Sequence, residues 1–549
     1  MSFSSLQRKA YIQNLKTENF DLLVIGGGIT GAGIALDAAV RGLKVALVEK
    51  NDFASGTSSR STKLIHGGLR YLKQLEVKLV REVGKERATV YNNAPHIVIP
   101  EKMLLPIVKK GSLGKYSSSL GLYVYDRLAD VEKKERRKMM SRSETIKKEP
   151  LLRRDILLGG GLYIEYRSDD ARLVIENMKA AVERGATCLN YAQLKECTRT
   201  DGKVSGAIIQ DGLTGESFEV KAKTIINAAG PWVDDVRKKE GSLQGKHLLL
   251  TKGVHIVVSK SRLPLNASVY FDVSTDNRMI FAIPRGKVVY IGTTDTVYPK
   301  DQDVNFPFAD MEDAIYILKA ANFMFPEANL TIEDIESTWA GLRPLIYEEG
   351  KDPSEVSRKD EIFITDSKLI SIAGGKLTGY RKMAERAVDE AFDQLKHIDG
   401  RKHVKCTTKR VTLSGGDLKG HIGVVQFVKY LQAQYPDFTP ESIEELVYKY
   451  GTSADEILDA AKKVDTEDNL LLAEMDYCIE EESVVSVSDF LIRRTGRLFF
   501  DRPSLADKYK MIHEYISEKC GHTKEISDQQ LAMFEKEYFG VVAFKSLIK

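Results

Sequence analysis

The chain has 549 residues, which is too long for one compact hydrophobic core, so we expect two or three domains. Hydrophobic residues make up 43% and charged residues 29%, as in ordinary globular proteins, and no run approaches the ~20 consecutive apolar residues of a membrane-spanning helix. The net charge of +3 is small, and five scattered cysteines without metal-ligand spacing indicate reduced thiols and no metal site. The N-terminus lacks the apolar core of a secretory signal, so we expect a cytoplasmic protein.

Residues 21–50, DLLVIGGGITGAGIALDAAVRGLKVALVEK, are typical of a strand, a glycine turn, a helix and a second strand. The helix should end at Arg41-Gly42, because glycine is common just beyond a helix C-terminus. The apolar runs on both predicted strands indicate a parallel sheet that is buried on both faces.

The turn in this segment has the G-x-G-x-x-G spacing at Gly26, Gly28 and Gly31, and Glu49 ends the second strand. These glycines allow a tight turn, close approach of the backbone to a pyrophosphate and close helix packing. The helix N-terminus favours the pyrophosphate anion, and Glu49 would accept hydrogen bonds from a ribose. We therefore predict a dinucleotide-binding site.

The next segment, GTSSRSTKLIHGGLRYL at 56–72, carries five Ser and Thr hydroxyls and three glycines. In a typical NAD dehydrogenase, alternating strands and helices would follow at once, whereas here this polar loop intervenes. Two further strand, small-residue turn and helix patterns occur far downstream, at 222–236 and 368–392. A cofactor contacted by three distant segments favours an enclosed FAD over an exchangeable NAD.

Residues 131–154 contain ten Lys or Arg against four Asp or Glu. This run is either a solvated face of charged helices or a surface attracted to lipid headgroups or nucleic acid. The run lacks the interleaved aromatic residues that stack on bases, so we do not expect nucleic-acid binding. Apolar pieces beside basic ones across 101–154 instead suit a surface that lies on anionic lipid.

Later segments predict two more structural units. Residues 245–350 alternate in the manner of antiparallel strands and form a sheet inserted into the nucleotide domain. Beyond residue 400, FTPESIEELVYKYG and SVVSVSDFLIRRTGRLFF read as amphipathic helices, the first opened by Thr439-Pro440. The predicted domains are an oxidoreductase region at 1–400 and a helical C-terminal domain at 401–549, with FAD-binding segments near 18–80, 160–240 and 355–400 and a substrate sheet mainly at 241–354.

Several segments, in this order along the chain, resemble the FAD-dependent glycerol-3-phosphate dehydrogenases. IGGGITGAGIALDAAVRG is similar to the N-terminal signature of that family, and GGKLTGYRKMA is similar to its second signature. The smaller matches are SSRSTKLIHGGLRYL, NAAGPW (227–232), KGVHIVV (252–258), GTTDT (292–296) and GLRPL (341–345).

The resemblance implies an α/β fold with an FAD-binding, Rossmann-like domain of the amino-acid-oxidase type, an inserted antiparallel substrate sheet and an α-helical C-terminal domain. It implies that sn-glycerol 3-phosphate is oxidised to dihydroxyacetone phosphate in glycerol catabolism, with electrons passing from FAD to a membrane quinone. The protein would then lie peripherally on the inner face of the cell membrane. The sequence leaves open whether the chain forms a homodimer.

The resemblance also assigns roles to individual residues of the substrate site. Phosphate recognition favours guanidinium groups. His255 is the preferred general base, because imidazole titrates near neutral pH, and His66 is the rival that we place against the flavin. Lys376 would stabilise developing negative charge beside the flavin. The substrate-binding candidates are Arg70, Tyr71, His255, Thr294, Arg343 and Arg358, and the catalytic candidates are His255, Arg343 and Lys376.

The cofactor candidates come from the turns and the polar loop. The hydroxyls of the loop would hold the pyrophosphate, the ribityl chain and the ring edge, and its glycines would let backbone approach the flavin. Beside Gly26, Gly28, Gly31 and Glu49, the cofactor-binding candidates are Ser58, Ser59, Ser61, Thr62, His66, Gly67, Gly68, Gly230, Gly375, Lys376, Leu377 and Thr378.

Three other functions compete with the dehydrogenase. An oxidase with the same signatures would pass electrons to oxygen and produce hydrogen peroxide, but such oxidases tend to carry an extra insertion that this chain lacks. An amine oxidase of the wider fold is disfavoured by the arginines and by GGKLTGYR. A purely structural role would leave the polar loop with nothing to bind.

Overall fold

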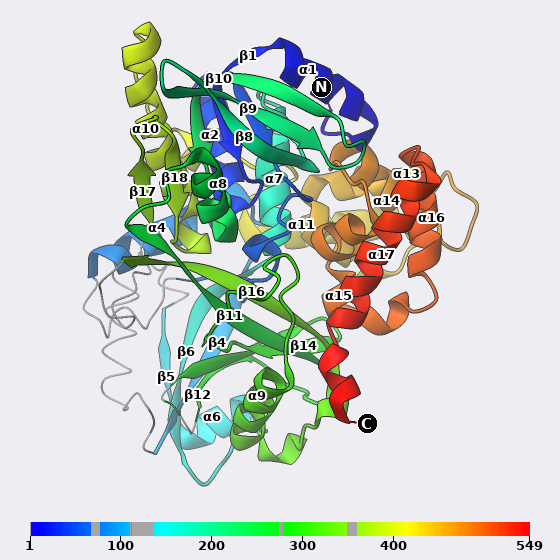
Figure 1. Cartoon of the computed structure of the whole chain (residues 1–549). Coiled ribbons are helices and arrows are strands. Elements are labelled where there is room, and N and C mark those ends of the chain that lie inside the picture. Colours follow the sequence, from blue (N-terminus) through cyan, green and yellow to red (C-terminus); the bar gives the residue numbers. More distant parts are fainter. Residues whose placement is uncertain are drawn as a thin grey trace.

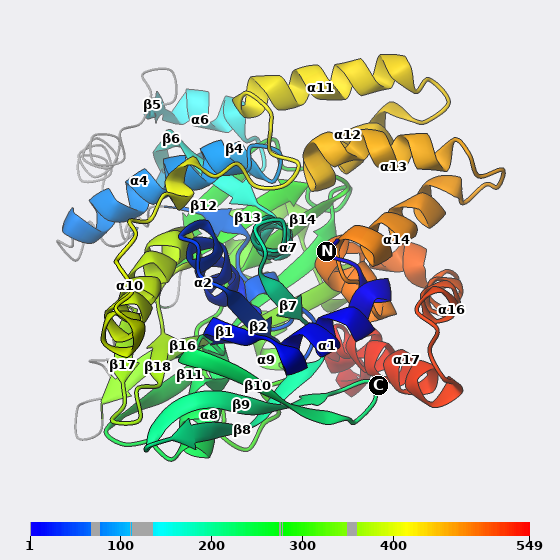
Figure 2. The same ribbon diagram turned by 90° about the horizontal axis from the view of Figure 1, so that it is seen from above.

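The computed structural model describes residues 2–66, 77–109, 111, 136–273, 276, 278–348 and 360–548. Two β-sheets form the centre of the molecule, and the C-terminal helices lie along one side of both (Figure 1). Seen from above, the N-terminal helix α1 (Arg8–Thr17) extends toward these helices (Figure 2). The backbone N–H of Ser483 donates to the carbonyl of Phe3 at 2.9 Å, which joins the N-terminal segment to the C-terminal helical part.

The first sheet has the strand order β17-β18-β10-β1-β2-β7, and the strands from β18 to β7 run parallel. Strands β8 and β9 extend the sheet from β10 in antiparallel fashion. The strand, helix and strand predicted for 21–50 are confirmed as β1, α2 and β2, and both downstream patterns also form. The strands are β1 (Asn19–Ile25), β2 (Val45–Val48), β7 (Thr187–Leu189), β8 (Ala192–Thr200), β9 (Lys203–Asp211), β10 (Ser217–Asn227), β17 (Glu361–Ile364) and β18 (Ile370–Ala373).

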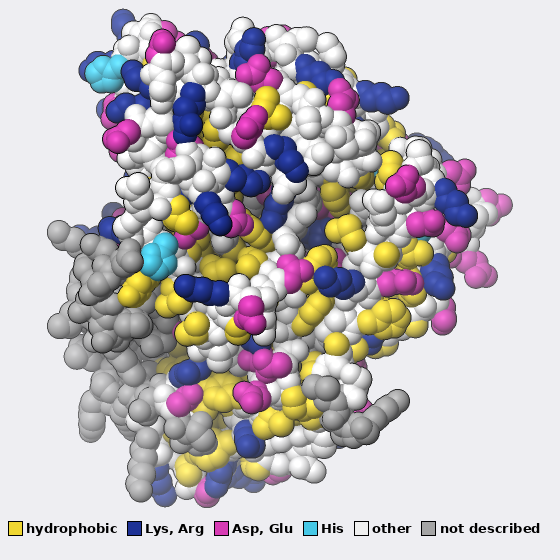
Figure 3. All heavy atoms as spheres, viewed as in Figure 1, with side chains coloured by type: hydrophobic (Ala, Val, Ile, Leu, Met, Phe, Trp, Pro, Cys, Tyr) yellow, Lys and Arg dark blue, Asp and Glu magenta, His cyan; other side chains and the backbone are white. Residues whose placement is uncertain are grey.

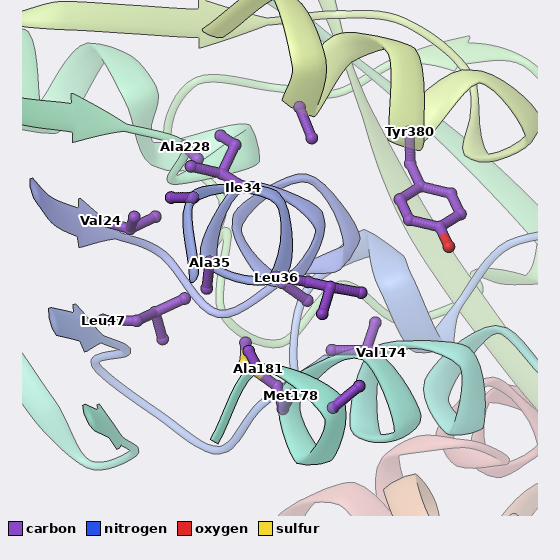
Figure 4. Packing of buried hydrophobic residues seen from close by; sticks show 14 of the residues in the cluster. Val24, Ile34, Ala35, Leu36, Leu47, Val174, Met178, Ala181, Ala228 and Tyr380 are labelled. Atoms are coloured by element: carbon purple, nitrogen blue, oxygen red, sulfur yellow. The ribbon is translucent and has the colours of Figure 1, made fainter. Parts of the chain in front are cut away.

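Both faces of this sheet are buried, because alternate residues of β1 enter different cores. Leu22 and Val24 pack with α2 (Ile29–Val40), α7 (Asp170–Val182) and α10 (Tyr380–Asp399), whereas Leu23 and Ile25 pack with α1 and the β8–β9 hairpin. Figure 4 shows α2 between α7 and α10, with Ala35 and Leu36 facing its neighbours. This close packing requires a small residue at Gly33, where an added Cβ would lie 2.9 Å from the Tyr380 ring.

The second sheet has the order β15-β11-β14-β13-β12-β4-β6-β3, with β16 on β11 and β5 on β6. All of its pairs are antiparallel except β12 with β4. Helix α9 (Met311–Met324) packs against one face. The substrate sheet, predicted mainly at 241–354, thus also includes strands from before residue 241. Its strands are β3 (Leu64–Ile65), β4 (Val98–Val108), β5 (Lys138–Ser141), β6 (Leu157–Ser168), β11 (Lys246–Ser259), β12 (Ser268–Asp272), β13 (Met279–Arg285), β14 (Val288–Gly292), β15 (Thr296–Val297) and β16 (Ile335–Glu348).

The C-terminal part is helical, as the sequence predicts. Thr439 caps α12, since its hydroxyl accepts the backbone N–H of Ser442 at 3.2 Å. The predicted helical segment at 483–500 forms, but its predicted amphipathic exposure is wrong: 489–494 is a π-helical turn that is buried on every side, and a short α15 follows. The helices are α11 (Gly420–Gln434), α12 (Pro440–Tyr450), α13 (Ala454–Ala461), α14 (Asn469–Glu481), α15 (Arg497–Phe500), α16 (Tyr509–Lys519) and α17 (Lys524–Gly540).

Buried charge pairs explain why the 489–494 turn lies inside the protein. Asp52, which follows β2, accepts from Arg493 Nε at 2.7 Å and from Arg494 at 2.8 and 3.0 Å. Arg172 on α7 forms a fully buried pair with Glu482. These groups must be paired, because an isolated buried charge is very costly. Among the helices that the structure describes, none is long and apolar enough to span a bilayer.

Candidate active site

The dinucleotide turn joins β1 to α2 with the geometry that its glycines permit. Gly26 has φ +111°, and an added Cβ there would lie 2.6 Å from the Ala228 carbonyl oxygen. At Gly31 an added Cβ would lie 1.9 Å from the Gly26 carbonyl oxygen. Gly28 precedes the first turn of α2, where Ser58 Oγ accepts the N–H of Ile29 at 3.0 Å. The polar loop therefore reaches the helix N-terminus that favours an anion.

Glu49 lies at the end of β2 and faces the same turn. Its carboxylate accepts the N–H of Gly27 at 2.7 Å and that of Asn51 at 2.9 Å. Burial raises the pKa of Glu49, while these two hydrogen bonds and the charge of Lys50 oppose the shift. The carboxylate is held in one orientation, as a ribose-binding group requires.

A cavity of about 680 Å³ follows the turn, within the range typical of ligand sites. Figure 3 shows a hollow between the two sheets with apolar side chains inside it and Lys and Arg side chains along it. The cavity is lined by three segments that are distant in sequence, as the FAD interpretation requires. They are 25–61 with Gly26, Gly28, Glu49, Ser58 and Ser61, then 192–239 with Gly230, and 344–383 with Gly375, Lys376 and Leu377.

The hydroxyls of the polar loop divide into two groups. Ser58 and Ser61 line the cavity, and Ser61 also donates to Asp170 Oδ2 at 2.7 Å. Ser59 is buried and does not line the cavity, so the structure does not bring it to the cofactor site. Thr62 instead lies 3.1 Å from the Nε2 atom of His255.

The turn after β18 meets the polar loop. Gly374 and Gly375 have φ +77° and +80°, and the chain then enters α10 through a short 3-10 turn that begins at Leu377. Thr378 is buried beside the loop, because its Oγ1 accepts the N–H of His66 and donates to the His66 carbonyl, both at 3.1 Å. Burial, together with the charges of Lys376 and Arg87, lowers the pKa of His66 to about 3. His66 is therefore neutral at physiological pH.

His255 lies on β11, 1% exposed, and stacks on Trp339 with ring centroids 4.8 Å apart. Its Nε2 contacts Thr62, and its Nδ1 has no hydrogen-bond partner among the described residues. Burial holds the pKa of His255 well below its usual range, and the charges of Arg343 and Lys63 add to this effect. The imidazole is therefore neutral, which is the form that can accept a proton.

Arg343 lies on β16 opposite Thr251, next to the cavity-lining Pro344. Its guanidinium donates to the Thr293 hydroxyl at 3.0 Å and pairs with Asp295 at 3.1 Å. The Thr294 hydroxyl accepts the Val254 N–H at 3.0 Å, so its side chain holds the backbone. Arg343 is thus a partly exposed guanidinium near His255, held by Thr293 and Asp295, and a guanidinium of this kind can bind phosphate.

Comparison with known proteins gives the family. Residues 21–375 match the family described as FAD dependent oxidoreductase, and residues 406–526 match the family described as the C-terminal domain of alpha-glycerophosphate oxidase. The chain is 52% identical over 525 residues to the aerobic glycerol-3-phosphate dehydrogenase of Bacillus subtilis, with 94% of each chain covered. It belongs to the glycerol-3-phosphate dehydrogenase family. The Staphylococcus epidermidis relative of the same name is 50% identical over 531 residues, with 95% of each chain covered.

Solved structures agree with this family. The X-ray structure of the Bacillus halodurans glycerol-3-phosphate dehydrogenase complexed with FAD is 44% identical, covers 98% of both chains and has a TM-score of 0.84. An L-α-glycerophosphate oxidase from Mycoplasma pneumoniae shares the fold, with a TM-score of 0.54 at 20% identity. The predicted fold class and the FAD cofactor are confirmed.

The site of this glycerol-3-phosphate dehydrogenase family member fits FAD on its own geometry. The backbone at Gly26 and Gly31 leaves no room for a side chain, the helix N-terminus faces the cavity, and Glu49 is preoriented. Gly26, Gly28, Glu49, Ser58 and Gly375 would hold the cofactor. FAD would supply the hydride acceptor.

Some predicted site residues lie outside the described part of the chain: Gly67, Gly68, Arg70, Tyr71 and Arg358. Conversely, sequence reasoning missed two buried residues that touch the site, Lys63 and Trp339. A lysine inside a polar loop looks solvent-exposed, and a tryptophan on an alternating strand looks like ordinary core. The signal for Lys63 was its place beside Thr62 in a segment that resembles the family.

Proposed function

We propose that this protein oxidises sn-glycerol 3-phosphate to dihydroxyacetone phosphate at the end of the cavity that Pro344 and Lys376 line. Relatives that are about half identical to this chain over nearly its whole length are named aerobic glycerol-3-phosphate dehydrogenase, and this supports the proposal. The observation that carries it is a neutral, buried His255 close to the Arg343 cation, beside a cavity suited to FAD. A phosphorylated alcohol needs this combination, a base for the hydroxyl and a guanidinium for the phosphate.

The reaction removes two electrons and two protons from the substrate. When bound, FAD would supply the acceptor for the hydride of C2. His255 is the neutral imidazole placed to accept the hydroxyl proton on a ring nitrogen, although burial and nearby cations make it a weaker base than an ordinary imidazole, which titrates near neutral pH. Arg343 orients the phosphate, and Lys376, half-buried at the start of the 3-10 turn, stabilises negative charge that develops on the C2 oxygen.

The acceptor in this proposal is a membrane quinone, which takes up two electrons and two protons to become a quinol. The protein would lie on anionic lipid at the inner face of the membrane. Support comes from exposed cations in the described part of the basic run, Arg142, Lys147 and Arg154, each of which could contribute ~1 kcal/mol near such a surface.

Anaerobic stopped-flow absorbance tests the substrate, and re-exposure to an acceptor tests the electron route. We expect glycerol 3-phosphate to bleach the flavin band, with fast recovery on adding a soluble quinone and slow recovery in air. Fast recovery in air with stoichiometric peroxide would assign the protein as an oxidase instead. No bleaching in folded, flavin-loaded protein would reject the substrate. His255→Asn is the matched variant: it retains a polar group near Thr62 but should slow bleaching at least ~100-fold.

A further inference from the structure

Lys63 is a buried cation inside an aromatic cage, although it belongs to the polar loop. It is 3% exposed, and its ammonium donates to Asp170 Oδ1 at 2.6 Å and to the Ser59 carbonyl at 2.9 Å. The same nitrogen lies 5.5, 5.9 and 5.8 Å from the ring centroids of Trp339, Phe499 and Phe500. Each distance is within the range of cation–π attraction.

The neighbours of Lys63 in the chain form the site. Thr62 contacts His255 at 3.1 Å, and Ser61 lines the cofactor cavity. The carboxylate that pairs with Lys63 also accepts from the N–H of Ser61 at 3.0 Å and from its hydroxyl at 2.7 Å. The buried Asp170 carboxylate therefore fixes the loop at both Ser61 and Lys63.

Trp339 connects the cage to the candidate base. Its Nε1–H donates to the Ser61 carbonyl at 3.0 Å, and its ring stacks on His255 with an interplanar angle of 13°. The two residues also face each other in the register of β11 and β16. A shift of Trp339 would thus move both the loop and the imidazole.

The other two walls of the cage come from the C-terminal helical domain. Phe499 and Phe500 end α15, and their rings lie 5.4 and 5.6 Å from Trp339. The Ser337 hydroxyl on β16 donates to the Phe499 carbonyl at 2.5 Å, which fixes α15 against the strand that carries Arg343. The cage closes only when the two parts of the chain are in contact.

We propose that Lys63 is a positioning residue through which the C-terminal helical domain holds the 56–66 loop and His255 in the geometry for substrate oxidation. Stability alone does not account for this arrangement, because a buried ion pair often contributes no more than apolar residues of the same volume. The catalytic part of the inference rests on the proposed function, whereas the positioning of the loop does not.

The experiment uses full-length, FAD-loaded protein and two readouts. Hydrogen exchange of the 57–66 amides reports loop order without any substrate, and anaerobic flavin bleaching by glycerol 3-phosphate reports the reaction. Phe499→Leu/Phe500→Leu opens the cage but leaves the ion pair intact, and Lys63→Met/Asp170→Asn removes both charges together. Phe534→Leu is the matched control, since Phe534 is a fully buried phenylalanine of the same domain that contacts Tyr509 and Tyr538 instead.

We expect both double variants to increase amide exchange at 57–66 about tenfold and to slow bleaching by roughly 10- to 100-fold per bound flavin. The pH profiles for bleaching should differ between the two double variants. Loss of the Lys63 charge removes one cause of the lowered His255 pKa, so in Lys63→Met/Asp170→Asn the acidic limb of the profile should move to higher pH. Lys63→Arg should restore part of the rate. Phe534→Leu should lower the thermal midpoint but leave both readouts unchanged.

Two outcomes would overturn the proposal. One is wild-type exchange and bleaching in both double variants. The other is an equal loss in Phe534→Leu, which would make the effect general destabilisation. If the unmodified protein is not bleached by glycerol 3-phosphate, the proposed function fails, but the amide exchange still decides the role of Lys63. If the charge-removing variant does not fold, the phenylalanine variant, which keeps every charge, decides the same question.

Discussion

Replacing Gly253 by alanine should impair the reaction without unfolding the protein. Gly253 lies on β11 opposite Gly341, and the Arg343 guanidinium passes over it. An added Cβ would lie 2.3 Å from the nearest guanidinium nitrogen of Arg343 and 2.6 Å from its central carbon. Non-bonded heavy atoms approach to roughly 3.5 Å, so the guanidinium would have to move by roughly 1 Å.

The size of the effect follows from that displacement. A misplacement of about 1 Å in a group that orients substrate can cost about 100-fold in rate, which corresponds to about 2.7 kcal/mol of transition-state stabilisation. The cost to folding should be small, because the displaced group is the end of a flexible side chain. We therefore expect kcat/KM for glycerol 3-phosphate to fall roughly 100-fold while the thermal midpoint changes by only about 2 °C.

A double-mutant cycle with Arg343→Ala is the decisive assay. If the alanine acts by displacing the guanidinium, Gly253→Ala should cost almost nothing further once that guanidinium is gone. Steady-state kinetics on the two single variants and the double variant give this coupling. Unchanged kinetics in Gly253→Ala, or the same loss in both backgrounds, would show that the alanine does not act by displacing the guanidinium.

Three further predictions concern the fold and the cofactor. Asp52→Ala should lower the free energy of unfolding by about 3–5 kcal/mol, because it leaves the arginines of 489–494 buried and unpaired. Asp52→Asn should lower it by less, and urea unfolding measures both variants. Burial lowers the pKa of His96 from 6.5 to about 3, so its contribution to stability is complete above pH 6.5 and is lost as pH falls toward 3. Urea unfolding should therefore show up to about 2 kcal/mol less stability at pH 5 than at pH 7 from this group. His96→Leu should remove that difference. Gly31→Ala puts a Cβ 1.9 Å from a backbone oxygen that cannot move away, so the purified protein should contain less than about a tenth of the usual flavin by absorbance ratio.

Local chemistry explains which parts of this molecule a sequence can predict. The turn at Gly26 and the cap at Thr439 are set by residues within one or two turns of chain, so their spacing is visible in the sequence. Glu49 is equally local, because it ends the strand that follows the turn. The three-segment cofactor cavity was also predictable, since each segment repeats the same strand, small-residue turn and helix pattern.

The buried charges were not predictable in this way. The 483–500 segment has polar and apolar residues at helical spacing, and an amphipathic helix is the natural reading of that pattern. In the structure Arg493 and Arg494 point inward because Asp52, more than 400 residues earlier, supplies their counter-charge. Lys63 is missed for the same reason, since its cage comes from β16 and α15. Pairing between distant segments leaves no periodic signal in either of them.

These distant contacts connect the C-terminal domain to the segment that leads from Glu49 to the polar loop. Residues 49–66 run from the Glu49 carboxylate to the His255 neighbourhood, and the domain contacts this segment near both of its ends and also at Arg60, which pairs with Glu537 at 3.0 Å. The arginines of 489–494 pair with Asp52, three residues after Glu49, and the rings of α15 enclose Lys63, next to Thr62. A segment that is fixed near both of its ends has little conformational freedom left to lose on binding FAD, which lowers the entropic cost of holding the cofactor. The helical domain therefore preorganises the site, although none of its described residues lines the cavity.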